Sequence, residues 1–120
     1  VFTHGFITYA NQAKVAMIGV DEDHIETHGA VSEVVAKEMA EGTLKHSGSD
    51  IAVSVTGIAG PTGGTKEKPV GTVWIGISVG NGERVETFAE MKFYTNGRAV
   101  FKQLASQAVL MKILRTVREY

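Results

Sequence analysis

Three polar side chains with the potential for catalysis stand near the start of the chain, at Tyr9, Asn11 and Lys14. Tyr9 ends a strand predicted over Val1 to Tyr9, and Asn11 and Lys14 follow it. A lysine that is held near other polar groups and partly removed from water has a lowered pKa and can act as a general base. A lone lysine after a strand is nevertheless solvated in most proteins, so the residues alone favour a surface lysine.

A second candidate is the stretch from Val53 to Thr72, where a strand of small residues runs into a glycine-rich loop. Valine and isoleucine alternate with small residues in this strand, which predicts a buried strand whose small side is closely packed. Glycines at 57, 60, 63 and 64 would let the backbone approach a ligand. Ligands of open α/β sheets bind at the carboxyl ends of strands, so we interpret this as a binding loop. A surface connection without function is the alternative.

Arg98 is the candidate for binding a phosphate, because it opens the last predicted helix. Arginine can bind phosphate through two N–H groups, and a helix start adds free backbone N–H groups. Arginines at the start of a helix are, however, more often ordinary surface residues than phosphate ligands. We interpret Lys66 and Lys68, in the glycine-rich loop, as solvated charges.

The histidines do not predict a metal site. His24 and His28 stand four residues apart, as two helix ligands would, but no third ligand follows at a familiar spacing. His28 precedes Gly29 and is expected to end a short helix. No Walker loop and no G-x-G-x-x-G pattern is present in the sequence.

The elements that must position these residues alternate between helix and strand, which favours an α/β fold with helices on both faces of a mixed sheet. Short helices are expected over Lys14 to Gly19 and Asp21 to His28, and a longer one over about Ser32 to Ser47. A strand from Ile51 precedes the loop. After the loop come strands from Gly71 to Val79 and from Arg84 to Tyr94, joined at Asn81-Gly82. A last helix is expected over about Gly97 to Tyr120. Its apolar stripe would consist of Val100, Leu104, Ala108 and Met111.

Composition fits a single domain. The chain has 120 residues, of which 43% are hydrophobic and 21% charged, enough for one core. Its net charge of −1 gives no electrostatic reason to expect a nucleic-acid or membrane partner. It has no cysteine, and no run that resembles a membrane span or secretion signal, so we expect a cytoplasmic location.

Four segments of the chain carry a family resemblance. They are T-G-I-A-G-P from Thr56 to Pro61, K-P-V-G-T-V-W-I from Lys68 to Ile75, G-F-I-T-Y-A-N-Q-A-K from Gly5 to Lys14, and H-G-A-V-S from His28 to Ser32. In this order they resemble the C-terminal domain of the competence/damage-inducible CinA proteins, the family of nicotinamide-nucleotide amidases. The resemblance implies a three-layer sandwich with a mixed sheet flanked by helices.

The resemblance also implies a missing part. The family's domain opens with a strand and a helix that carry an E-S-C-T-G-G motif, whose serine is the nucleophile, and no such segment precedes Val1. We therefore expect residues 1–120 to form a single CinA C-terminal-like domain that is incomplete at its N-terminus, without the family's first strand and helix.

The resemblance assigns roles to the candidate residues. Lys14 falls at the position of the family's catalytic lysine and Tyr9 at that of its accompanying tyrosine, while Arg98 matches an arginine associated with the mononucleotide substrate. Asn11 and the loop residues Thr56, Gly57 and Gly60 are then expected to surround the substrate. No metal or other cofactor is expected, and the expected partners are a mononucleotide and other copies of the chain.

The activity implied by the resemblance is hydrolysis of nicotinamide mononucleotide to nicotinate mononucleotide and ammonia, a step of pyridine nucleotide salvage. A Ser–Lys amidase needs a neutral lysine to take the serine proton, and backbone N–H groups for the oxyanion. One alternative is a catalytically inactive CinA-type module that binds a nucleotide or a protein partner. Another is a hydrolase of a different small amide, since a fold does not fix its substrate.

Overall fold

A three-stranded sheet forms the middle of the molecule. The computed structural model describes residues 4–60, 62–81, 84–95 and 97–119. The strands β1 (Ile51–Gly57), β2 (Thr72–Asn81) and β3 (Arg84–Phe93) pair in the order β1-β2-β3. Both pairs are antiparallel, so the parallel pairing that a mixed sheet requires is not found among the described strands. The two antiparallel strands expected after the loop are confirmed, and Gly82 of their connection lies outside the described residues.

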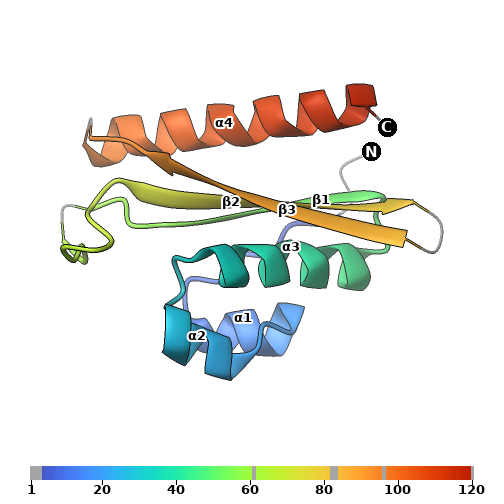
Figure 1. Cartoon of the computed structure of the whole chain (residues 1–120), viewed down its shortest axis with the longest axis horizontal. Coiled ribbons are helices and arrows are strands. Elements are labelled where there is room, and N and C mark those ends of the chain that lie inside the picture. Colours follow the sequence, from blue (N-terminus) through green and yellow to red (C-terminus); the bar gives the residue numbers. More distant parts are fainter. Residues whose placement is uncertain (1–3, 61, 82–83, 96, 120) are drawn as a thin grey trace.

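Helices cover both faces of this sheet, as the sandwich prediction requires (Figure 1). The long helix α4 (Arg98–Glu119) lies on one face, and α3 (Glu33–Ser47) lies on the other. Two short helices, α1 (Asn11–Ile18) and α2 (Glu22–His28), lie beyond α3. The α/β class and the helical layers on both sides of the sheet are therefore confirmed.

The N-terminal segment does not form the predicted strand. Its described part, residues 4–9, has no strand or helix assignment, so the prediction of a strand over Val1 to Tyr9 is wrong for these residues. A β-strand must form hydrogen bonds with a neighbouring strand. Among the described residues, β1 pairs with β2 alone, so the N-terminal segment has no strand to pair with there. The segment and β1 both line one cavity.

Side-chain caps fix the starts of α2 and α3. The Asp21 carboxylate accepts a hydrogen bond from the Asp23 backbone N–H at 2.9 Å, as expected for an N-cap. The Ser32 hydroxyl accepts one from the Val35 N–H at 3.3 Å. The Lys45 and His46 side chains stand in the last turn of α3, where positive charge suits the carbonyl end.

The small side of β1 packs directly against α3, which confirms the close packing predicted from its sequence. The Ser54 hydroxyl donates to the Ala36 carbonyl oxygen at 2.6 Å. On β2, a Cβ atom at Gly76 would overlap that same carbonyl oxygen and the Ser54 hydroxyl. The α3 backbone therefore touches the sheet at Gly76, where any residue larger than glycine would force the two layers apart.

Helix α4 packs one residue out of step with the predicted stripe. Its buried positions include Phe101, Ala105 and Thr116, whereas Val100 and Met111 are 40% and 48% exposed. Phe101 packs with Val73 and Ile75 of β2, among others. The largest apolar side chain of the first turns therefore takes the buried position, which turns the predicted stripe partly toward solvent. The predicted stripe is corrected accordingly.

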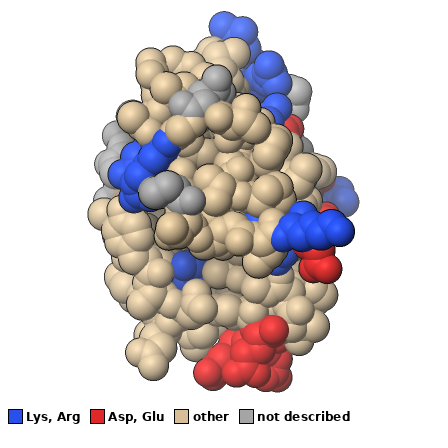
Figure 2. Space-filling view, turned by 90° about the vertical axis from the view of Figure 1, so that its left-hand side faces the viewer, with Lys and Arg blue, Asp and Glu red and all other residues tan. Residues whose placement is uncertain are grey.

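Charge is unevenly distributed over the end of the molecule that carries the glycine-rich loop (Figure 2). Asp and Glu gather at the lower edge, on the side of α2, whose sequence contains Glu22, Asp23 and Glu26. Lys and Arg project from the middle and upper parts of the same face, toward α4. In the part of the chain that the structure describes, no helix is long and apolar enough to cross a membrane.

Gly76→Ala tests the contact between α3 and the sheet. The added methyl group must displace backbone, so we expect the free energy of unfolding to fall by about 3 kcal/mol in urea titrations. Gly80→Ala is the matched control, because a Cβ there would make only ordinary contacts, with the Leu44 side chain at 3.5 Å and the Asp50 carbonyl oxygen at 4.0 Å. Equal stability of the two variants would contradict the close contact.

Candidate active site

Lys14 is the only lysine, arginine or acidic residue that is buried among the described residues. It is 6% exposed, and its Nζ donates to the Thr8 carbonyl oxygen at 2.5 Å. None of the ion pairs found among the described residues includes Lys14. Burial lowers the pKa of Lys14 from its ordinary value of 10.5, because removal from water disfavours the ammonium form.

The position of Lys14 is fixed by packing of α1 against α3. Ile18 of α1 is 2% exposed and belongs to a core cluster with Val35 and Met39 of α3. The two backbones also approach closely, since a Cβ at Gly42 of α3 would overlap the Ile18 carbonyl oxygen. Helix α3 in turn contacts the sheet. The position of Lys14 is therefore set by the sheet, through α3 and α1.

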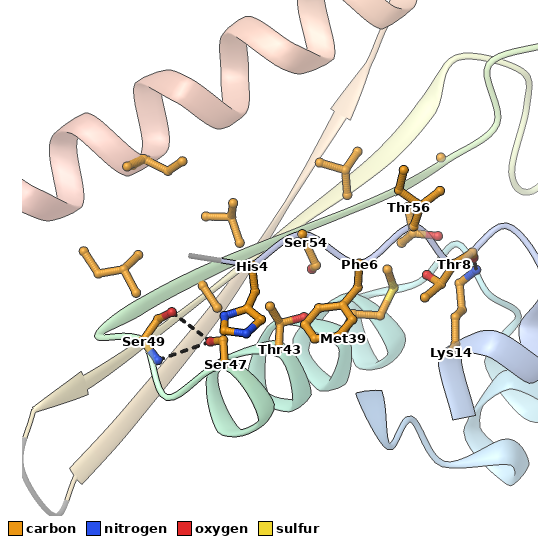
Figure 3. A pocket seen from close by; sticks show the side chains of 18 of the residues that line it. His4, Phe6, Thr8, Lys14, Met39, Thr43, Ser47, Ser49, Ser54 and Thr56 are labelled. Atoms are coloured by element: carbon orange, nitrogen blue, oxygen red, sulfur yellow. Dashed lines mark hydrogen bonds between the residues drawn. The ribbon is translucent and has the colours of Figure 1, made fainter. Parts of the chain in front are cut away.

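A large cavity lies beside Lys14, with a volume of about 990 Å³. It is bounded by the N-terminal segment, by β1, and by parts of α1, α3 and α4. In Figure 3, Lys14 and Thr8 lie at the end of the cavity near Thr56, and His4 and Ser47 lie at the other end. Five of the predicted site residues line it: Tyr9, Asn11, Lys14, Thr56 and Gly57.

Tyr9 and Asn11 stand on the exposed side of this cavity. The Tyr9 side chain is 91% exposed, although it contributes to the lining. Asn11 is the first residue of α1 and is also exposed. Both side chains are therefore free to turn toward a ligand that enters beside Lys14.

Thr56 and Gly57 have structural contacts that explain their residue types. The Thr56 hydroxyl donates to the Ala30 carbonyl oxygen at 2.8 Å, which ties β1 to the segment before α3. A Cβ at Gly57 would lie 2.9 Å from the Phe101 ring. Thr56 and Gly57 therefore present backbone and small side-chain surface to the cavity.

Gly60 and Arg98 contact each other outside the lining of the cavity. The Arg98 Nη1 donates to the Gly60 carbonyl oxygen at 2.9 Å, which fastens the glycine-rich loop to the first residue of α4. Gly60 has a positive φ of 82°, and a Cβ there would overlap Val70. This contact between Arg98 and the loop has no signal in the sequence, because 38 residues separate the two partners.

Lys68 is not the solvated loop charge that its sequence position suggests. It is only partly exposed, and its Nζ donates to the His28 carbonyl oxygen at the last residue of α2. A cation at the carbonyl end of a helix is favourable. The loop is therefore held at two points, by Lys68 to α2 and by Arg98 to α4.

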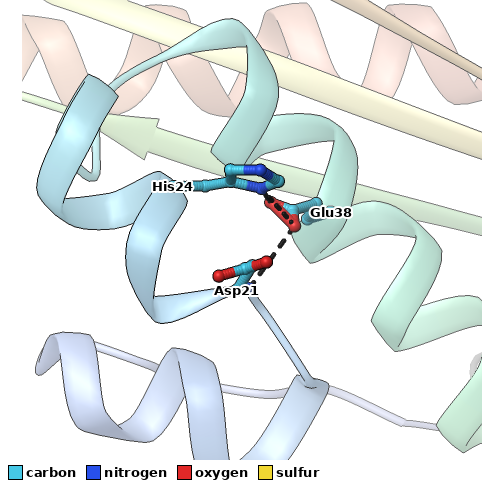
Figure 4. Close-up of side chains that lie close together, drawn as sticks. All are labelled: Asp21, His24 and Glu38. Carbon is cyan, nitrogen blue, oxygen red and sulfur yellow. Dashed lines mark hydrogen bonds and ion pairs between the residues drawn. The ribbon is translucent and has the colours of Figure 1, made fainter.

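A cluster around His24 is a further feature that sequence spacing missed. The His24 Nδ1 lies 2.9 Å from both carboxylate oxygens of Glu38, a residue of α3 (Figure 4). The hydrogen bond to Glu38 is the main cause that raises the pKa of His24. Asp21 completes a group of three potential metal ligands, which includes a third ligand that the sequence analysis did not find.

The sequence matches a known family over nearly its whole length. The model of the CinA C-terminal domain matches residues 1–117. A CinA-like protein of Akkermansia muciniphila is 50% identical over 119 residues, which are 99% of this chain and 28% of that protein. A nicotinamide-nucleotide amidohydrolase, PncC of Escherichia coli, is 56% identical over 84 residues, which are 70% of this chain and 51% of that protein.

Solved structures show the same fold. The competence/damage-inducible protein CihA of Agrobacterium tumefaciens superposes with a TM-score of 0.84 at 40% identity, over 92% of this chain and 66% of that one. A CinA superfamily protein of Escherichia coli gives 0.83 at 29% identity, over 91% of this chain and 61% of that one. The chain thus spans little more than a quarter of the length of the first curated relative. It belongs to the CinA C-terminal domain family.

Proposed function

We propose that this chain is the greater part of a nicotinamide-nucleotide amidase domain, which converts nicotinamide mononucleotide and water to nicotinate mononucleotide and ammonia. The observation that carries the proposal is Lys14, a buried amine without a carboxylate partner among the described residues, at the wall of a large cavity. The relationship to the amidohydrolase of Escherichia coli supports the reaction type.

Lys14 would act as the general base for a serine. As the serine oxygen attacks the carboxamide carbon, its proton passes to the neutral Nζ, and the tetrahedral intermediate forms. When that intermediate collapses, Lys14 returns the proton to the leaving nitrogen, and ammonia departs. Water then hydrolyses the acyl-serine with Lys14 again as base. A lowered pKa suits this role, because the base must be neutral at the start.

The nucleophilic serine of this proposal lies outside the chain. Three described serines line the cavity, and all three hydroxyls take part in hydrogen bonds: Ser54 donates to the Ala36 carbonyl oxygen, and Ser47 donates to the Ser49 hydroxyl. The outer edge of β1 faces the cavity and has no strand partner among the described residues. A serine-bearing strand that paired there would bring its side chains close to Lys14.

The substrate would extend from this cavity toward Arg98. Gly57 lines the cavity, and Gly60, whose carbonyl binds Arg98, follows three residues later, at most about 10 Å along the chain. A mononucleotide has a comparable length. Arg98 uses one guanidinium nitrogen for Gly60, so its remaining donors are available for a phosphate. Tyr9 and Asn11 would contact the substrate at the open side of the cavity.

Lys14→Met tests the general base in the longer protein that also contains the serine. Methionine preserves most of the buried stem but cannot accept a proton, so ammonia release from nicotinamide mononucleotide should fall at least about a hundredfold. The chain of 120 residues alone should be inactive.

Lys45→Met is the matched control, because Lys45 is exposed on α3 and away from the cavity lining. Thermal unfolding of each variant separates lost chemistry from lost structure. A folded Lys14→Met enzyme with turnover within tenfold of the parent would rule out Lys14 as the base.

Arg98→Ala tests the phosphate site. Phosphate contacts are made in the ground state and the transition state alike, so the KM for nicotinamide mononucleotide should rise about tenfold or more, with a smaller fall in kcat. The dephosphorylated nucleoside should be affected much less. Arg115→Ala, on the exposed side of the same helix, is the control variant. An equal loss on nucleotide and nucleoside would show that Arg98 serves only to hold the loop.

A further inference from the structure

Asp21, His24 and Glu38 bring three metal-binding groups together on the side of α3 that faces away from the sheet (Figure 4). Their potential ligand atoms all lie within 4.8 Å of one another. Donor atoms around a zinc ion stand about 3.4 Å apart, given bond lengths near 2.1 Å. Small side-chain rotations would therefore place all three groups around one ion.

Local structure holds each of these groups in place. Asp21 caps α2 and His24 lies three residues later, which puts both on neighbouring turns of one helix face. Ile25, the next residue, packs with Val35 and Met39 and so fixes α2 against α3. The Asp21 backbone N–H also points to the Glu38 carboxylate, at 3.4 Å. The cluster thus joins two elements whose relative position is set by the core.

The charge around His24 favours a cation. Neither Asp21 nor Glu38 forms an ion pair with a lysine or arginine among the described residues. The Asp23 carboxylate adds to the negative field at His24. With a neutral imidazole, the cluster therefore carries uncompensated negative charge beside a nitrogen ligand.

We propose that Asp21, His24 and Glu38 bind a divalent first-row transition-metal ion, with Zn²⁺ bound more tightly than Mn²⁺. One imidazole nitrogen and two carboxylates suit these ions better than Mg²⁺, which prefers oxygen ligands alone. Three protein ligands leave the remaining positions to water. The chain has no cysteine, so thiolates cannot compete for the ion.

A bound ion would fasten α2 to α3. None of the three ligands lines the Lys14 cavity, so the ion would act on the fold rather than on a ligand there. Because α1, α2 and α3 share one core cluster, this link would stiffen the layer that carries Lys14. The measurable consequence is a higher unfolding temperature in the presence of the ion.

Calorimetric titration of the chelator-treated chain with Zn²⁺ tests the site. We expect one ion per chain, and affinities at least about tenfold weaker in His24→Ala and in Glu38→Gln. His46→Ala is the matched control, because His46 is an exposed histidine of α3 outside the cluster, and it should bind like the parent. Circular dichroism shows whether each variant is folded.

Paramagnetic Mn²⁺ gives a site-specific readout that does not depend on any variant. It should broaden the ring-proton NMR signals of His24 at concentrations that leave those of His46 sharp. Equal broadening of both rings, equal Zn²⁺ affinity in parent and His24→Ala, or an equal loss in His46→Ala would each overturn the proposal. The cluster would then be a surface His–Glu ion pair only.

Discussion

The close approach of α3 to the sheet fixes where α1, and with it Lys14, can lie. Gly76 and Ser54 leave room for the Ala36 carbonyl, and the Ser54 hydroxyl satisfies that oxygen at 2.6 Å. On its other side, α3 meets α1 at Gly42 with similarly little space. Successive close contacts, each made at a glycine, therefore set the distance from β1 to Lys14. A larger residue at either glycine would move the lysine relative to the cavity.

Burial of Lys14 is costly and therefore informative. A buried amine loses hydration, and here a single carbonyl oxygen replaces it. Packing alone would be served better by an apolar residue of similar length, such as methionine. The cost is explained if the neutral amine is needed, since a base of lowered pKa works near neutral pH. The large cavity beside it supplies the space for a reacting group.

Local signals in the sequence predicted much of the fold, whereas long-range contacts were not predictable. Caps, glycines and periodicity located α2, α3 and the hairpin to within a few residues, and alternation in β1 identified the side packed on α3. The stripe of α4 was misjudged because two registers fit helical spacing, and only the fit of Phe101 against β2 selects one. The bond from Lys68 to His28 and the meeting of His24 with Glu38 join distant positions, so no spacing rule reveals them.

The Lys14 amine is neutral more readily in this fold than a lysine amine in water, because burial disfavours its ammonium form. A ¹³C NMR titration of the Lys14 Cε, in protein labelled at lysine, measures this directly. We expect Lys14 to titrate clearly below its ordinary pKa of 10.5, because its burial disfavours the ammonium form. Titration of Lys14 at its ordinary pKa of 10.5, or above it, would contradict this, because the buried site would then not disfavour the ammonium form.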